Sequence, residues 1–388
     1  MMKLLHTSDW HLGHTLYNYD RAEEQRQMLQ QIADIVRDEQ PDVFILSGDV
    51  YHTAQPSASV QTMFTEAIVR MHEACPRMTM VITAGNHDSG VKHEVFSTPW
   101  KALNVFAIGT IKKEHLEEHI IEVPEVGYVI AMPYVSDRNI PEGVFQQLLD
   151  MVAERNKSSL PVVMMAHTAV SGCDFVGHEH ATLSNVGGID TIDVAQLGNG
   201  YDYLALGHIH HAQFVHTGHH NVRYAGSPLP VSFDEAFDHS VSLVTIAGHG
   251  AVPVVTPLSI LNPFPLVSLP SQGFASWDEV KKLLEDFPKD VPAYIRLNVE
   301  VEDFLPADAN YEAIRLIQDK RCRFCYINAR RKDEAHSESK VLTVEEFQSE
   351  QPIDIARRFA EDTGATFDDG MSKLFNLVLE TINEENQS

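Results

Sequence analysis

The chain has 388 residues, enough for two or three domains of ordinary size. A composition of 44% hydrophobic and 22% charged residues is that of a globular protein and excludes a disordered chain. The formal net charge of −26 argues against a protein that coats nucleic acid with a broad basic surface, but bound metal ions or a partner can supply local positive charge.

The first half of the chain alternates strand-like and helical stretches. The opening "MMKLLHTSDWH" lacks a signal-peptide cleavage pattern and is predicted to be the first strand. Apolar residues recur every three or four positions in 21–39 and in 57–74, which predicts two amphipathic helices. Strands that alternate with helices are typical of an α/β core. No apolar stretch approaches the roughly 18 to 20 residues of a membrane helix, so we expect a cytoplasmic protein.

The pattern changes after about residue 200. Segments such as "SVSLVTIAG" and "AVPVVTPL" predict strands joined by turns, so we expect a mainly antiparallel second sheet. The Pro- and Ser-rich stretch 261–273 indicates a boundary, and beyond it a strand, a helix and a strand predict a small βαβ-like module. A polar linker then leads to two amphipathic helices. We therefore expect domains at 1–265, 266–335 and 336–388.

The four cysteines include one C-x-x-C pair, Cys322 and Cys325. A structural zinc site usually needs four ligands, so a single pair is weak support for zinc. The pair also falls in a strand-like segment. We interpret these residues as packing cysteines of a reducing compartment.

Five apolar runs of strand length each end in Asp, Asn or His. In chain order the ends carry Asp9 and His11, then Asp49, then Asn86, His87 and Asp88, then His167, then His208 and His210. Any one of them alone is more typical of a turn, a helix cap or a structural histidine. Together they indicate a site, because the carboxyl ends of parallel strands gather along one edge of a sheet, where such folds bind ligands.

Seven of these side chains are candidate metal ligands: two carboxylates, one amide and four imidazoles. They are Asp9, His11, Asp49, Asn86, His167, His208 and His210. Mixed oxygen and nitrogen ligation suits Mn²⁺, Fe²⁺ or Zn²⁺ better than calcium or copper(I). Seven side chains are too many for one ion, so they predict two ions, roughly 3.5 to 4 Å apart, that share a carboxylate. Two aspartates leave such a pair a charge of about +2, which attracts a phosphate ester.

The motifs D-x-H, G-D, G-N-H-D, a lone His and G-H-x-H resemble those of the calcineurin-like metallophosphoesterases. The segments "LLHTSDWHLG", "LSGDVYH", "AGNHDS", "ALGHIH" and "RYAGSPLPVSFDE" narrow the resemblance to the SbcD branch, the nuclease subunits of a bacterial double-strand-break repair complex. The strongest motifs lie within residues 4–235. The resemblance implies an α/β fold, a four-layer αββα sandwich with a small βαβ capping domain over a DNA groove and a C-terminal helical hairpin.

The resemblance also implies roles for single residues. One ion would be held by Asp9, His11, Asp49 and His210, and the other by Asp49, Asn86, His167 and His208. Asp49 would bridge the two ions. His87 would approach the scissile phosphate and assist the leaving group, and Asp88 would orient its ring. His52 would be a second histidine near the DNA; the alternative is that it only begins a loop.

Family members are typically Mn²⁺-dependent double-strand exonucleases and single-strand or hairpin endonucleases that act in DNA repair, recombination and replication. The resemblance thus implies two Mn²⁺ ions, DNA ends or hairpins as substrate, and a site of action on the nucleoid. The expected partner is SbcC, a coiled-coil ATPase with a basic surface. The C-terminal helices, with 11 Asp or Glu and 3 Lys or Arg over 341–388, would dock on it. The alternative is a helical hairpin that packs on its own chain.

Helices at 57–74 and 93–106 would, by the same resemblance, form a homodimer through a four-helix bundle. The candidate contacts are Val60, Phe64, Phe96 and Trp100. An equally good interpretation places these residues in the core of the chain itself.

Two other functions remain open. One is a stand-alone phosphomonoesterase or cyclic-nucleotide phosphodiesterase that uses the same site. Protein phosphatases of this superfamily carry an arginine soon after G-D and end their third motif in Glu, whereas this chain has "GDVYHTAQPS" and Asp88. About 120 residues beyond the predicted core also favour the nuclease. The other is a non-catalytic scaffold, which the presence of all seven ligands disfavours.

Overall fold

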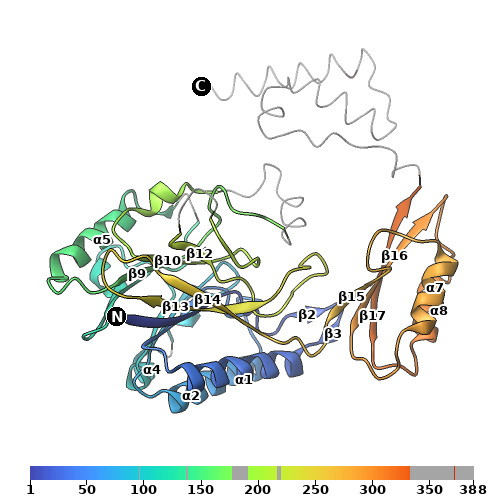
Figure 1. The fold of residues 1–388 in the computed structure, drawn as a ribbon, viewed down its shortest axis with the longest axis horizontal. Coiled ribbons are helices and arrows are strands. Elements are labelled where there is room, and N and C mark those ends of the chain that lie inside the picture. Colours follow the sequence, from blue (N-terminus) through green and yellow to red (C-terminus); the bar gives the residue numbers. More distant parts are fainter. Residues whose placement is uncertain (96, 137–138, 177–190, 216–219, 333–370, 372–388) are drawn as a thin grey trace. The chain divides into compact units, whose positions relative to one another are not determined.

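The computed structural model describes residues 1–388 except 96, 137–138, 177–190, 216–219, 333–370 and 372–388 (Figure 1). The chain forms two compact units, Met1–Arg330 and Arg331–Ser388. The expected C-terminal helices lie almost entirely outside the described residues, as does Phe96. Within the described part of the chain, no helix has the length and apolar character needed to cross a membrane.

The first of two six-stranded sheets has the order β14-β13-β1-β4-β5-β6. Its strands are β1 (Met2–Thr7), β4 (Val43–Ser47), β5 (Thr79–Thr83), β6 (Val105–Ile108), β13 (Ser240–Ile246) and β14 (Val254–Ser259). Four neighbouring strands, β1, β4, β5 and β6, are parallel, and β13 and β14 add antiparallel to the β1 side. Every residue of β4 and β5 is buried, which explains their continuous apolar runs.

The second sheet has the order β11-β12-β10-β9-β8-β7. Its strands are β7 (Ile120–Val123), β8 (Gly127–Ala131), β9 (Val162–His167), β10 (Tyr203–Gly207), β11 (Gln213–Phe214) and β12 (Val222–Tyr224). Only the edge strands β7 and β11 pair antiparallel, so the expected mainly antiparallel sheet is wrong. The segments "SVSLVTIAG" and "AVPVVTPL" form β13 and β14 of the first sheet, because an apolar strand does not itself specify the sheet it joins.

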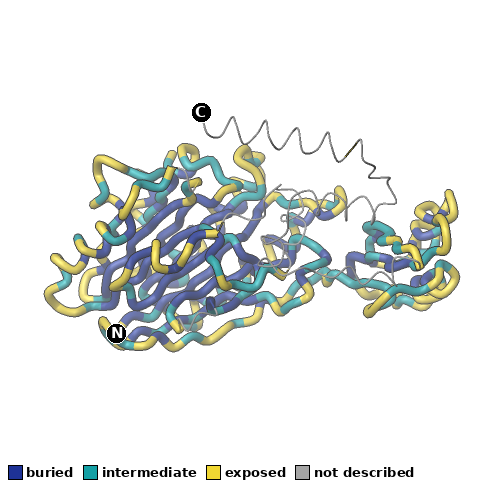
Figure 2. Tube along the Cα trace, turned by 90° about the horizontal axis from the view of Figure 1, so that it is seen from above, coloured by how far each residue is buried: buried dark blue, intermediate teal, exposed yellow. Residues whose placement is uncertain are grey.

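Helices cover the outer faces of both sheets, and the expected αββα sandwich is confirmed (Figure 1). The helices α1 (Ala22–Glu39) and α2 (Ala58–Ala74) pack on the first sheet, as the periodicity predicts. The helix α5 (Val144–Arg155) packs on the second. A third apolar cluster fills the space between the sheets, where Figure 2 shows the tube dark blue.

The expected helix at 93–106 is instead a series of short elements: α3 (Gly90–His93), α4 (Ser97–Trp100), the 3-10 turn η1 (Lys101–Leu103) and the start of β6. Trp100 is buried, with its ring 5.5 Å from that of Phe64. Both belong to the core under the first sheet, while Val60 packs against it and is half-buried. Phe64 and Trp100 are therefore core residues of this chain.

Residues 266–331, here named the α/β module, form a three-stranded sheet with its own apolar cluster. The elements are β15 (Leu266–Leu269), α7 (Trp277–Asp286), β16 (Tyr294–Val301), α8 (Ala309–Leu316) and β17 (Arg323–Arg331). The predicted strand, helix and strand are β16, α8 and β17, and β15 and α7 are additions. Cys322 lies in this apolar cluster and Cys325 packs against a smaller one, and neither forms a disulfide.

The α/β module is joined to α1 by buried polar contacts. The Tyr294 hydroxyl donates to Glu24 Oε1 over 2.7 Å, and Arg323 Nη1 donates to the same oxygen over 3.2 Å. A short hairpin of β2 (Thr15–Leu16) and β3 (Tyr19–Asp20) lies between β1 and α1 in the chain, and the Tyr19 hydroxyl donates to the Phe324 carbonyl. The α/β module thus contacts the beginning of α1 and this hairpin.

Candidate metal centre

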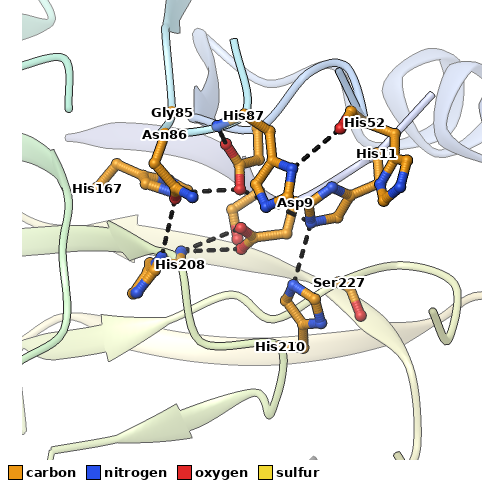
Figure 3. Close-up of polar contacts among 12 residues, drawn as sticks. Asp9, His11, His52, Gly85, Asn86, His87, His167, His208, His210 and Ser227 are labelled. Carbon is orange, nitrogen blue, oxygen red and sulfur yellow. Dashed lines mark hydrogen bonds and ion pairs between the residues drawn. The ribbon is translucent and has the colours of Figure 1, made fainter. Parts of the chain in front are cut away.

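The carboxyl ends of β1, β4, β5, β9 and β10 meet at one place and deliver all the candidate side chains (Figure 3). The loops after β1 and β4 are joined by main-chain hydrogen bonds, from Asp9 N to Gly48 O over 3.1 Å and from His11 N to Asp49 O over 3.0 Å. The predicted convergence of strand ends is therefore present in the fold.

One side of the cluster, named side one, consists of Asp9, His11 and His210. Each offers a ligand atom, and these atoms lie within 4.8 Å of one another. The Nε2 atoms of His11 and His210 face each other over 3.1 Å (Figure 3). Two buried imidazole nitrogens and a carboxylate form a donor set that fits a first-row divalent ion.

The other side, named side two, consists of Asn86, His167 and His208. Asn86 Oδ1 lies 3.0 Å from His167 Nε2 and 3.1 Å from His208 Nδ1. Asp49 Oδ2 lies 3.4 Å from His167 Nε2 and 3.7 Å from His11 Nε2, so this oxygen is between the two sides. A carboxylate in that position fits the shared ligand of an ion pair.

Two candidate ligands, His167 and His210, have rings whose orientation is set by a hydrogen bond from Nδ1. His167 Nδ1 donates to the Ser47 carbonyl over 2.8 Å, which directs Nε2 into the cluster. His210 Nδ1 donates to Glu235 Oε1 over 2.9 Å, and Ser227 Oγ donates to the other oxygen of Glu235. Outer partners of this kind set the tautomer and orientation of a metal-binding histidine.

Glu235 was not predicted from the sequence. It stands 25 residues after His210 in an irregular segment, and no periodicity connects the two positions. In the sequence it only ends the segment "RYAGSPLPVSFDE", and its need for a partner follows from its burial in the fold.

Four candidate ligands have left-handed backbone conformations: Asp9, His11, Asp49 and His208, with φ of 53°, 44°, 49° and 98°. Such conformations are uncommon in residues other than glycine and gather at functional sites. This backbone strain is an independent indication that the strand ends form a site.

At two motif positions glycine is needed because other atoms lie too close for a Cβ, and not because the chain turns there. A Cβ atom on Gly85 would lie 2.1 Å from Asp49 Oδ1, and one on Gly207 would lie 1.9 Å from the Ser47 carbonyl oxygen. Neither glycine has a positive φ, whereas Gly48 does, at 83°. Of these three glycines, only Gly48 has a backbone conformation that itself favours glycine.

The charges of the cluster shift several pKa values. Burial raises the pKa of Asp49, but His167 and its neighbours outweigh burial and hold this pKa well below its usual range. Burial lowers the pKa of His167, but Asp49 raises it more strongly, to about 9. The pKa of His210 is likewise lowered by burial and raised by Glu235, to about 8. The carboxylates of the cluster therefore favour the positively charged forms of His167 and His210.

His87 lies at the mouth of side one. Its ring centroid is 4.9 Å from that of His11, and its ring stacks on that of His52 at 5.5 Å and 23°. His87 Nδ1 donates to the His52 carbonyl over 2.9 Å (Figure 3). The main-chain N–H of His87 donates to Asp49 Oδ1. His11, His52 and His87 also form a cluster in which ring nitrogens lie within 4.8 Å of one another.

The expectation that Asp88 orients the ring of His87 is wrong. The carboxylate of Asp88 accepts hydrogen bonds from the main-chain N–H groups of Val50, Tyr51 and Gly85, at 3.1, 2.9 and 2.9 Å. Loop N–H groups that are buried need acceptors, and Asp88 supplies them. Asp88 thereby joins the loops after β4 and β5, and the His52 carbonyl orients His87.

The chain is similar to known proteins over the residues that form this centre. The sequence model of the family described as calcineurin-like phosphoesterase matches residues 2–212. The chain is 32% identical over 312 residues to the SbcD component of the SbcCD nuclease of Rhodobacter capsulatus, covering 73% of this chain and 75% of that protein. It is 28% identical to the protein of the same name from Bacillus subtilis, covering 99% of both chains. The corresponding protein of Escherichia coli K12 is 26% identical over 78% of this chain and 79% of its own.

Proposed function

The chain belongs to the SbcD family of calcineurin-like phosphoesterases, and from this premise we propose that it is a metal-dependent DNA nuclease, the SbcD-type component of an SbcC–SbcD repair complex. The observation that carries the proposal is the cluster at the strand ends. Oxygen and nitrogen donors converge there on two sides of a single carboxylate, Asp49. The proposed reaction is hydrolysis of a phosphodiester bond in DNA.

The donors fit two ions, most simply Mn²⁺. Side one with Asp49 would hold the first, through Asp9, His11 and His210, and side two with Asp49 would hold the second, through Asn86, His167 and His208. When bound, such a pair supplies a water of lowered pKa and positive charge for the phosphate oxygens.

His87 is the proposed phosphate-facing residue. Its Nδ1 is committed to the His52 carbonyl, so Nε2 is the ring nitrogen left for a phosphate oxygen or for the leaving group. Its main-chain bond to Asp49 fixes the residue relative to the centre. His52 supplies a carbonyl to His87 and a stacked ring, which we propose lies beside the DNA. Asp88 keeps both loops in place.

We propose that DNA binding depends on a partner. A chain with a net charge of −26 has little electrostatic attraction for DNA, and the names of the relatives place them in a two-component nuclease. The segment 336–388 is proposed to bind the SbcC-type ATPase, the α/β module to cap the DNA groove, and 57–74 to contribute to a homodimer. The complex is proposed to act in the cytoplasm, at the nucleoid.

The test compares substrates. We expect Mn²⁺-dependent degradation of linear duplex DNA by the chain with its ATPase partner, and slower hydrolysis of bis(p-nitrophenyl) phosphate by the chain alone. Hydrolysis of p-nitrophenyl phosphate without any DNA degradation would identify a stand-alone phosphomonoesterase instead.

Substitution of His87, the proposed phosphate-facing residue, distinguishes a catalytic nuclease from a non-catalytic scaffold. We expect His87→Leu to reduce DNA degradation by about 100-fold or more, the typical contribution of a positioned acid or base. Because His87 is in neither proposed ligand set, Mn²⁺ binding should persist. His220→Leu, on an exposed histidine outside the centre, is the matched control. Undiminished degradation by His87→Leu would remove the catalytic assignment.

A further inference from the structure

An exposed tyrosine lies in the hairpin that follows the loop of Asp9 and His11 and is not one of the candidate ligands. Tyr17 forms the turn between β2 and β3, six residues after His11, and is 45% exposed. Both Tyr17 and Asn18 have left-handed backbone conformations, with φ of 48° and 67°. That conformation is a rare one for a bulky aromatic residue, so the hairpin holds Tyr17 outward against its local preference.

The ring of Tyr17 is backed by a second aromatic layer. It stacks on Tyr326 of β17 with centroids 4.7 Å apart and planes at 22°. Phe233 contacts both rings, at 6.1 Å from Tyr17 and 5.8 Å from Tyr326. The Arg296 guanidinium lies 5.3 Å from the Phe233 ring and donates to Asp234. These contacts fix the orientation of Tyr17, so one face of its ring is held and the other is available.

The aromatic group, Tyr17, Tyr326 and Phe233, is tied to the metal centre by two short stretches of chain. Tyr17 follows His11 of side one by six residues. Phe233 precedes by two residues Glu235, which accepts the hydrogen bond from His210. The group is therefore joined to side one by short chain segments, and it lies where the β2–β3 hairpin contacts β17 of the α/β module.

We propose that the exposed face of Tyr17 is a stacking site for an unpaired nucleobase of the strand whose phosphate enters the centre. This proposal rests on the proposed nuclease function. Base–aromatic stacking needs no positive charge, so it can hold a strand on a protein of net charge −26. Every base has a π-face, so the site takes any sequence. Bases within a duplex already stack on each other, so the site selects single-stranded ends and hairpin loops.

A structural clamp is the competing explanation, because the Tyr17–Tyr326 stack also joins the sandwich to the α/β module. The two explanations differ in what they predict for substrates of different size. A clamp would affect hydrolysis of every phosphodiester alike. A stacking site affects only a substrate that carries a base next to the scissile phosphate.

The experiment measures kcat/KM of the full chain with Mn²⁺ for a fluorescent single-stranded oligonucleotide and for bis(p-nitrophenyl) phosphate. We expect Tyr17→Ala to lower the ratio of the first value to the second about 10-fold, through KM of the oligonucleotide. Tyr17→Phe keeps the ring and should hold the ratio within about twofold of wild type. Tyr311→Ala is the matched control, since Tyr311 is a 73% exposed tyrosine on α8.

An unchanged ratio for Tyr17→Ala, whether both activities persist or both fall together, would overturn the stacking site. A ratio that falls equally for Tyr17→Phe would also overturn it, since the ring is then not what binds. If the wild-type chain hydrolyses neither substrate, the proposed function itself fails, and that result is separate from any effect of Tyr17.

Discussion

The two sides of the candidate metal centre have similar candidate ligands, but these are supported in different ways. On side one, His210 donates to the buried carboxylate of Glu235, a side chain from a distant loop. On side two, His167 donates to the main-chain carbonyl of Ser47, the last residue of β4. An anionic acceptor strengthens the ring as a metal ligand more than a neutral carbonyl does.

The difference shows where each side can be altered without touching a ligand. Side one depends on a side chain, so a substitution at Glu235 can weaken it alone. Side two depends on the approach of three strand ends, and its outer support is main chain. It can be disturbed only by changing the space between those strands. Asp49 is common to both sides, so its loss cannot distinguish them.

The largest expected effect comes from removing the shared carboxylate. Asp49→Ala should abolish binding of both ions and lower DNA degradation by about 1,000-fold or more, since metal catalysis supplies several kcal/mol. Bound Mn²⁺ is counted by elemental analysis after gel filtration. Asp38→Ala, at an exposed aspartate of α1, is the control. Retention of one tightly bound ion by Asp49→Ala would show that the two sides are independent sites.

The next largest effect is expected from a substitution that disturbs the main chain at side two. A Cβ on Gly207 would meet the Ser47 carbonyl oxygen at 1.9 Å and His167 Nδ1 at 2.9 Å, so Gly207→Ala must push β10 away from β4. We expect a loss of activity of about 100-fold, the cost of an error of about 1 Å in placement. Gly248→Ala is a well-matched control, because no atom of the described residues lies within 4 Å of the Cβ that it would add. Equal activities of the two variants would contradict the proposed geometry of side two.

A smaller effect should be confined to side one. Glu235→Gln keeps the shape but removes the charge behind His210, and outer-partner changes of this kind cost about 10- to 100-fold in metal affinity. Calorimetric titration with Mn²⁺ should show one weakened and one normal site. Glu66→Gln, at an exposed glutamate of α2, is the control. If both sites weaken together, the supports of the two sides are not separate.

The smallest expected effect of a substitution is a change in pH dependence. The pKa of His210 is about 8 and that of His167 about 9, above the ordinary value for histidine, so both carry protons at neutral pH. Mn²⁺ must displace these protons, so its affinity should rise with pH between about 6.5 and 9, by up to about 10-fold per pH unit for each proton released. Glu235→Gln lowers the pKa of His210 and should reduce the proton release at side one. A Mn²⁺ affinity that is constant over this range would contradict the assigned protonation.

The sequence predicted the seven candidate ligands because each ends an apolar run, and run ends of parallel strands must meet. It also predicted α1 and α2, whose periodicity is local. The role of Asp88 could not be predicted, since its partners are main-chain N–H groups of another loop. Glu235 was missed for the same reason, a contact between distant segments. The sheet that β13 and β14 join is likewise decided by long-range pairing.

The most direct test of the account is the spin state of bound Mn²⁺. Two ions that share Asp49 at roughly 3.5 to 4 Å must interact magnetically. We therefore expect electron paramagnetic resonance of the full chain at two equivalents of Mn²⁺ to show a spin-coupled pair, and Asp49→Ala to lose it. A spectrum of isolated Mn²⁺ at every loading of the wild-type chain would contradict a shared two-metal centre.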